Sequence, residues 1–351
     1  MPAPAVWRSL RVYDGRWMIY PARVRGALRP SQPAHSSIVN REFTAMPDAA
    51  ASAPPPSKLR IFLRRLLSFV VLWTIVLAAM FSGREWLANY VFLSIMMLLA
   101  TLGLVEFYEL VEKRGLVCFR WMGVLGGWVL MVGTFLHCTG KLGLHTSPSR
   151  VNDFESALLV LLVLGLCVRQ FVSRTNTAGL LAISTTLFGL MYVPWLLNFI
   201  QAINFFPTIG GDGKFYVLYF ILVTKFSDTG AYAVGSLIGR HKMIPRISPA
   251  KTWEGFGGAV FGSVAASLVF VPCARGHLPG MTPLHAVVLG VLLSVAAVIG
   301  DLIESLFKRE AGVKDSGRFF PGIGGILDLL DSLLFNAPIM YLYLRHVLTH
   351  P

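Results

Sequence analysis

The feature that most constrains the fold of this chain is a series of about nine apolar runs. Each run is close to the roughly 20 residues that an α-helix needs to cross a bilayer. Only 14% of the 351 residues are charged, whereas a soluble domain carries roughly 25%. The sequence therefore predicts an all-α, polytopic integral membrane protein with about nine transmembrane helices. We place the runs near residues 62–81, 87–107, 121–138, 155–172, 178–203, 215–236, 256–273, 284–307 and 326–345.

Residues 1–57 differ in composition from the rest of the chain. They contain seven arginines against three acidic residues and end in an alanine- and proline-rich stretch over 49–56. Such a composition does not build a hydrophobic core, so we expect a disordered basic segment. Two interpretations are open, an organellar targeting segment or a start assigned upstream of the true one at Met46. We expect residues 58–351 to form a membrane-embedded domain whose motifs lie within 220–335.

Lysine and arginine are distributed unequally between the two sides of this predicted domain. The segment just before the first run, together with the connections on the same side of the membrane, holds 17 lysines and arginines. The connections on the opposite side of the membrane hold six. The positive-inside rule therefore places the amino terminus in the cytosol and the carboxyl terminus outside. The net charge of +13 fits cytosolic loops beside anionic lipid, and we expect no nucleic-acid partner.

The highest density of charge lies over residues 300–332, between the last two apolar runs. Asp301 and Glu304 are three residues apart near the end of the eighth run. A helix therefore places both carboxylates on one face, with Ser305 and Lys308 close by.

The ninth run opens with Asp328 and Asp331, again three residues apart. A hairpin of two membrane helices would bring this pair next to Asp301 at the cytosolic face. Carboxylates beside cations and a glycine-rich turn with free backbone N–H groups suit a divalent metal ion and phosphate. The cations and turn residues between the two runs are Lys308, Arg309, Lys314, Arg318, Pro321, Gly322, Gly324 and Gly325.

A second group of polar residues lies within and after the sixth run. Lys225 and Asp228 fall inside an otherwise apolar stretch, where ionisable side chains are costly and commonly functional. The alternative is that they mark a helix end or pair with each other. Gly230, Gly235 and Gly239 permit close contacts between helices.

The order of residues in both stretches resembles the signature of phosphatidate cytidylyltransferases, also called CDP-diacylglycerol synthases. The second stretch contributes SPAKTWEG over residues 248–255, after Asp228-Thr229-Gly230. Two positions depart from the family pattern, because Ile323 and Leu329 stand where His and Arg are usual. The first stretch matches at Ser305, Lys308, Arg309, Lys314, Asp315, Pro321, Gly322, Gly324, Gly325, Asp328 and Asp331.

The resemblance implies a nucleotidyltransferase of phospholipid biosynthesis in a bacterial inner membrane, with its site at the cytosolic face. Such an enzyme transfers CMP from CTP to phosphatidate, releases pyrophosphate, uses Mg²⁺ alone or with a second cation, and forms a homodimer. The implied metal ligands are Asp301, Asp328 and Asp331. The implied catalytic residues are Asp301, Lys314, Asp315, Asp328 and Asp331. The implied substrate-binding residues are Asp228, Lys251, Ser305, Lys308, Arg309, Gly324 and Gly325.

Two other classes of function stay open at this stage. One is a related CTP-dependent lipid enzyme, such as a CDP-archaeol synthase or a lipid alcohol kinase, and Ile323 and Leu329 keep it open. The other is a transporter or flippase whose charged residues line a pathway. We would expect internal repeats with paired broken helices in a transporter, and the sequence contains no recognisable repeat.

The remaining polar residues have simpler interpretations. Glu106, Glu109 and Glu112 recur at helical spacing beside Lys113 and Arg114, which is typical of the solvated end of an interfacial helix. The four cysteines show no CxxC spacing, so we expect free thiols.

Overall fold

The chain divides into two units, Met1–Pro55 and Pro56–Pro351. The computed structural model describes residues 11–13, 16–18, 74, 78, 83–141, 148–173, 178–206, 213–317 and 324–349, with the backbone alone over 11–13, 16–18 and 148–152. The described part of the first unit is a pair of antiparallel strands, β1 (Arg11–Tyr13) and β2 (Arg16–Met18). The predicted disorder of residues 1–57 otherwise lies outside the described residues, and the boundary at residue 57 stays a prediction.

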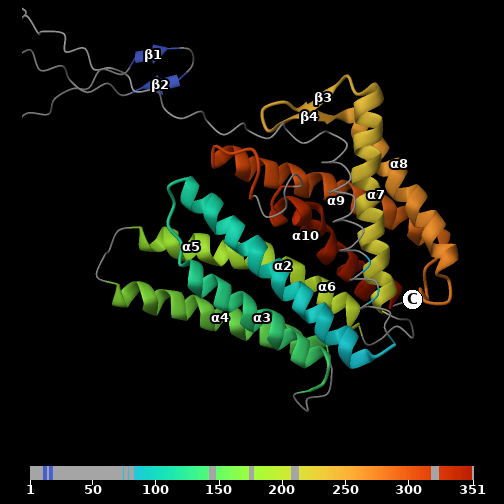
Figure 1. Ribbon diagram of the computed structural model, residues 1–351, viewed down its shortest axis with the longest axis horizontal. Helices are drawn as coiled ribbons and strands as arrows, with labels where there is room; N and C mark the ends of the chain where they lie inside the picture. Colours follow the sequence, from blue (N-terminus) through green and yellow to red (C-terminus); the bar gives the residue numbers. More distant parts are fainter. Residues whose placement is uncertain are drawn as a thin grey trace, which may run out of the picture. The chain divides into compact units, whose positions relative to one another are not determined.

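The described part of the second unit is built almost entirely from helices (Figure 1). Seven of its helical segments are long and apolar enough to cross a membrane, so the prediction of an all-α membrane protein is confirmed. The count of nine stays a prediction, because most of the run at 62–81 lies outside the described residues and α7 is not among the seven. The helices are α2 (Glu85–Lys113), α3 (Arg120–Cys138), α4 (Pro148–Val172), α5 (Gly179–Leu190), η1 (Met191–Trp195), α6 (Leu196–Asn204), α7 (Gly213–Ile238), α8 (Trp253–Cys273), α9 (Pro283–Glu310), α10 (Ile326–Tyr343) and η2 (Leu344–Leu348).

The run predicted over 178–203 is one helical segment with an irregular centre. It consists of α5 and α6 joined by the π-helical turn η1, which contains Pro194. Proline has no N–H to donate and its ring crowds the preceding turn. A wider π turn accommodates it without ending the helix.

The connection between α7 and α8 has regular structure that the sequence analysis does not predict. It forms a small antiparallel hairpin of β3 (Lys242–Ile244) and β4 (Ser248–Thr252). The hairpin follows the end of α7 in Figure 1. The Arg309 Nε of α9 donates to the carbonyl oxygen of Ile247 (3.2 Å), so the turn of the hairpin lies beside the end of α9.

The helices α7 and α8 pack closely along their length, and α9 packs against both α8 and α10. At the α7–α8 contact, a side chain at Gly230 or Gly258 would collide with the carbonyl oxygen of the other glycine. The prediction that Gly230 permits a close helix contact is therefore confirmed. This packing gathers the end of α7, the end of α9, the start of α10 and the hairpin around one cavity.

Candidate functional site

A cavity of about 710 Å³ lies where α7, α9, α10 and the β3–β4 hairpin meet. It combines an apolar wall with a dense set of charged groups, which is the usual composition of a small-molecule site. Its charged lining residues are Lys225, Asp228, Lys242, Lys251, Asp301, Lys308, Asp328 and Asp331.

Three carboxylates come together at the side of this cavity. Asp301 and Glu304 lie on one face of α9, as their spacing predicts, and Asp331 reaches them from α10. One carboxylate oxygen from each lies within 4.8 Å of the other two. Glu304 is completely buried. Three hard oxygen donors at this separation fit a divalent cation such as Mg²⁺.

Asp328 belongs to a neighbouring group of charges. Its Oδ1 accepts a hydrogen bond from Lys308 Nζ (2.6 Å), and the same ammonium group is ion-paired with Glu304. Its Oδ2 accepts the backbone N–H of Gly325 (2.8 Å) at the start of α10. The structure thus brings together two of the three predicted metal ligands, Asp301 and Asp331, and groups Glu304 with them instead of Asp328.

The other lysines of the cavity hold the remaining acids. Lys251 Nζ lies 2.7 Å from an Asp301 oxygen, and Lys225 Nζ lies 3.4 Å from an Asp228 oxygen. Asp228 also accepts a hydrogen bond from Ser332 Oγ (3.3 Å).

The ion pairs leave negative charge in the cavity. Four carboxylates line the cavity and that of Glu304 lies beside it, and three lysines form ion pairs with four of these five acids. Asp331 is the carboxylate of this group without an ion pair among the described residues. Even with Lys242 counted, the five acids exceed the lysines of the cavity by one negative charge when all are ionised. Buried acids without compensation are costly, so the arrangement suits a bound divalent cation. Lys242 lines the same cavity and has no ion pair among the described residues, which leaves its ammonium group open to a phosphate.

Four further predicted site residues lie at the edge of this arrangement. Ser305 Oγ donates to Asp301 Oδ1 (3.4 Å). Arg309 is exposed and donates to the carbonyl oxygens of Ile247 and Val313. Lys314 and Asp315 are exposed on the turn after α9 and are not among the residues that line the cavity.

The glycine-rich turn is partly described. Gly324 adopts a φ of 107°, a left-handed conformation that glycine tolerates best. Residues 318–323, with the predicted Arg318, Pro321 and Gly322, lie outside the described residues. At the start of α10 the expectation of free N–H groups is wrong, because those of Gly325, Ile326 and Leu327 all donate to carboxylates.

Two carboxylates at this site were missed by the sequence interpretation. The sequence places Glu304 on one helix face with Asp301 but does not predict it as a metal ligand. The sequence predicts a solvated Glu106, but its side chain is buried and accepts hydrogen bonds from the start of α10. The signal available in the sequence is its helical spacing, three residues after Gly103 and four before Leu110, which puts it on one face with them. Both of these residues are buried in the structure, whereas Glu112 is exposed.

The SPAKTWEG motif over residues 248–255 mainly builds the β3–β4 hairpin and the start of α8. Thr252 Oγ1 accepts the N–H of Gly255 (3.1 Å) as the N-cap of α8. The Glu254 carboxylate accepts the N–H groups of Arg240 and His241, both at 3.1 Å. These bonds fix β4, so that Lys251 reaches Asp301 in the cavity.

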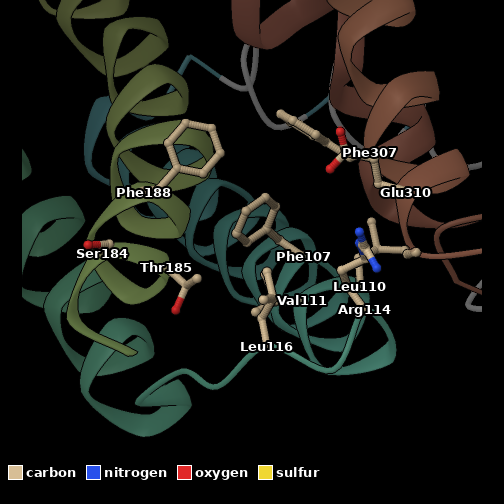
Figure 2. A pocket seen from close by; sticks show the side chains of 11 residues that line it. Phe107, Leu110, Val111, Arg114, Leu116, Ser184, Thr185, Phe188, Phe307 and Glu310 are labelled. Carbon is tan, nitrogen blue, oxygen red and sulfur yellow. The ribbon is translucent and has the colours of Figure 1, made fainter. Parts of the chain in front are cut away.

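A second, smaller cavity of about 280 Å³ lies beside α2, α5 and α9. Figure 2 shows Phe107, Phe188 and Phe307 around it. Their ring centroids are 5.7–6.2 Å apart. Its charged lining residues are Arg114 and Glu310, and it contains none of the clustered carboxylates, so it does not suit metal-assisted phosphate chemistry.

Fold and site together define a polytopic membrane protein with a carboxylate- and lysine-lined cavity suited to a divalent cation and phosphate. The model of the cytidylyltransferase family matches residues 63–347. Because the match spans well over half of the chain, this protein belongs to the cytidylyltransferase family, and the resemblance seen in the sequence is confirmed.

Several relatives carry the name phosphatidate cytidylyltransferase. The enzyme of Mycobacterium bovis is 35% identical over 198 residues, which cover 54% of this chain and 62% of that protein. The enzyme of Staphylococcus haemolyticus is 36% identical over 205 residues, which cover 54% of this chain and 78% of that protein. The enzyme of Staphylococcus aureus is 44% identical over 142 residues, which cover 40% and 53% of the two chains. The chain thus spans only part of the length of these relatives.

Proposed function

We propose that this protein transfers the cytidylyl group of CTP to phosphatidate, giving CDP-diacylglycerol and pyrophosphate. The observation that carries this proposal is the group of Asp301, Glu304 and Asp331 beside paired lysines, in a cavity among membrane-spanning helices. The names of the relatives supply the substrate class.

In this reaction a phosphate oxygen of phosphatidate attacks the α-phosphorus of CTP. A new P–O bond forms there, and the bond from the α-phosphorus to the oxygen bridging to the β-phosphorus breaks. Pyrophosphate leaves with the electron pair of that bond. Both reactants are polyanions, so the protein contributes mainly by holding them in line and by compensating charge.

Asp301, Glu304 and Asp331 fit the divalent cation, for which we propose Mg²⁺. When bound, such a cation neutralises charge on the phosphates and orients them. The side chains of Lys308 and Lys251 hold Asp328 and Asp301 in place.

Further cations of the chain are proposed to contact the substrates. Lys242, which lines the cavity without an ion pair among the described residues, is placed to meet a phosphate. The exposed side chains of Arg309 and Lys314 are proposed to contact phosphate at the rim, with Asp315 beside them. We propose that Gly324 allows close approach of substrate to this turn, whereas the space beside Gly325 is filled by Glu106 and Ser316.

The membrane setting suits a lipid and a soluble nucleotide as co-substrates. We propose that the cavity faces the cytosol at the bacterial inner membrane, so that CTP enters from water while the acyl chains stay in lipid. A homodimer is proposed from the resemblance to the family.

The decisive experiment follows radioactive label from CTP with the protein purified in detergent, phosphatidic acid and Mg²⁺. We expect label from [α-³²P]CTP in extractable lipid together with free pyrophosphate. Asp301→Asn and Asp331→Asn should reduce this labelling to background while the variants stay folded, as judged by thermal unfolding. Asp315→Asn serves as the matched acid outside the cavity and should cause a smaller loss.

The other outcomes separate the remaining functions. Label from [γ-³²P]CTP entering a lipid alcohol, without label from the α-position, would identify a lipid kinase. Transfer of neither label would overturn the proposed reaction.

A further inference from the structure

The start of α10 is held by a carboxylate that comes from α2. Glu106 Oε1 accepts the backbone N–H of Ile326 (3.0 Å), and Oε2 accepts the backbone N–H of Leu327 (2.9 Å). Oε2 also accepts the hydroxyl of Ser316 (3.2 Å). One side chain therefore binds both to the turn that follows α9 and to the first turn of α10.

The neighbouring glycines leave space for this carboxylate. A Cβ atom added at Gly317 would meet Glu106 Oε1, and one added at Gly325 would meet Glu106 Oε2 and the hydroxyl of Ser316. Gly325 has a φ of −80°, which any residue can adopt. Its lack of a side chain is therefore explained by the room that Glu106 and Ser316 need, not by backbone conformation.

The site is a favourable place for a buried anion. Glu106 is 6% exposed and has no lysine or arginine ion pair among the described residues. Instead it accepts three hydrogen bonds, two of them from N–H groups at a helix N-terminus, where the helix dipole stabilises negative charge. The N-terminal anion site of α10 is thus occupied by the protein's own carboxylates, Glu106 and Asp328.

The contact of Glu106 with the start of α10, called the Glu106 clamp below, lies close to the carboxylates proposed to bind the metal. Asp328 is the residue directly after Leu327, and Asp331 lies one helical turn further along α10 than Leu327. The Asp331 oxygen must stay within 4.8 Å of those of Asp301 and Glu304 on another helix. A shift at the start of α10 would therefore separate ligands that come from two different helices.

We infer, on the basis of the proposed function, that Glu106 is a positioning residue of this site. It binds neither substrate nor metal. By fixing the start of α10 against the turn after α9, it holds Asp331 at the correct distance from the two ligands on α9. Groups that orient metal ligands in this indirect way commonly change metal affinity or activity by about 10- to 100-fold when they are replaced.

The test compares Glu106→Gln with Glu112→Gln, which removes the same charge from an exposed position on the same helix. Binding of Mn²⁺ to the purified protein is measured by electron paramagnetic resonance, and amide hydrogen exchange is followed over residues 324–331. We expect Glu106→Gln to weaken Mn²⁺ binding by about 10- to 100-fold and to speed exchange at Ile326 and Leu327. Glu112→Gln should change neither. A purely structural role would lower the unfolding temperature without changing Mn²⁺ affinity of the folded fraction, and that result would overturn the inference.

A second variant keeps the test valid if Glu106→Gln does not fold. Gly317→Ala places a methyl group against the Glu106 carboxylate and should weaken Mn²⁺ binding in the same way. Where Glu106→Ala folds, the added methyl group should cause little further loss in that background, because the atoms it meets are gone. An equal loss of Mn²⁺ affinity from Gly317→Ala in the wild-type and Glu106→Ala backgrounds would contradict the Glu106 clamp.

The two proposals fail in different ways. If the wild-type protein binds Mn²⁺ and shows the expected response to Glu106→Gln but transfers no CMP, the proposed reaction is wrong and the positioning role stands. If it transfers CMP and Glu106→Gln leaves Mn²⁺ binding and exchange unchanged, only the positioning role is wrong.

Discussion

At the scale of single residues, the adjacent bases Lys308 and Arg309 have different surroundings. Lys308 is nearly buried and is the shared partner of Glu304 and Asp328, whereas Arg309 is exposed and binds carbonyl oxygens. Lys308→Met leaves two acids without their cation, and breaking a buried ion pair costs about 3–5 kcal/mol. Arg309→Met should cost about 1 kcal/mol. Thermal unfolding in detergent measures the difference.

A double variant shows whether unpaired charge is the cause. Lys308→Met combined with Glu304→Gln removes a buried acid together with its cation and should recover much of the stability but not the activity. Equal unfolding temperatures for Lys308→Met and Arg309→Met would contradict the assignment of Lys308 as the counter-ion.

The sequence predicted which acids come together at this site, but it did not predict the contacts made from distant helices. The shared face of Asp301 and Glu304 follows from helical spacing, and the approach of Asp331 follows from a hairpin of two helices. The bond from Glu106 to Leu327 spans 221 residues, and it depends on how α2 packs against α10. Nothing in the local pattern around Leu327 specifies that partner.

At the scale of elements, the β3–β4 hairpin carries one cation to the cavity. Thr252 is the N-cap of α8 beside Lys251, and Thr282 is the N-cap of α9, where its Oγ1 accepts the N–H of His285. Loss of a threonine cap costs about 1 kcal/mol. Thr252→Ala and Thr282→Ala should therefore destabilise the protein to a similar extent. Only Thr252→Ala should raise the KM for CTP, by about threefold or more, because it loosens β4 next to Lys251.

Steady-state kinetics at saturating phosphatidate tests this difference. A raised KM in both variants would show that general loss of stability is responsible. An unchanged KM in Thr252→Ala would show that the hairpin does not help to place Lys251.

The apolar periodicity predicted the helices but not their irregularities. The run over 178–203 gives the same pattern whether it is a regular α-helix or contains the π turn at Pro194. The hairpin escaped prediction because β3 and β4 are only three and five residues long, too short for an alternating pattern to be distinguished from a loop.

At the scale of the whole molecule, an all-α membrane protein follows directly from the length of the apolar runs. The orientation is a prediction from a different signal, the excess of basic residues on one side, and cysteine labelling tests it. In a background without Cys118, Cys138, Cys167 and Cys273, single cysteines replace the exposed residues Arg246 in the hairpin and Arg275 between α8 and α9. We expect a membrane-impermeant maleimide to label Arg275→Cys in intact cells and Arg246→Cys only after permeabilisation.

The result bears on the chemistry as well as on the orientation. The hairpin contributes Lys251 to the cavity, so under the proposed function the side that holds Arg246 is the side from which nucleotide enters. Cytosolic placement of the hairpin gives the site access to CTP, which is made and kept in the cytosol. Labelling of Arg246→Cys in intact cells, with protection of Arg275→Cys, would place the cavity on the side without CTP. The proposed cytidylyl transfer would then be untenable, even with every carboxylate in its present position.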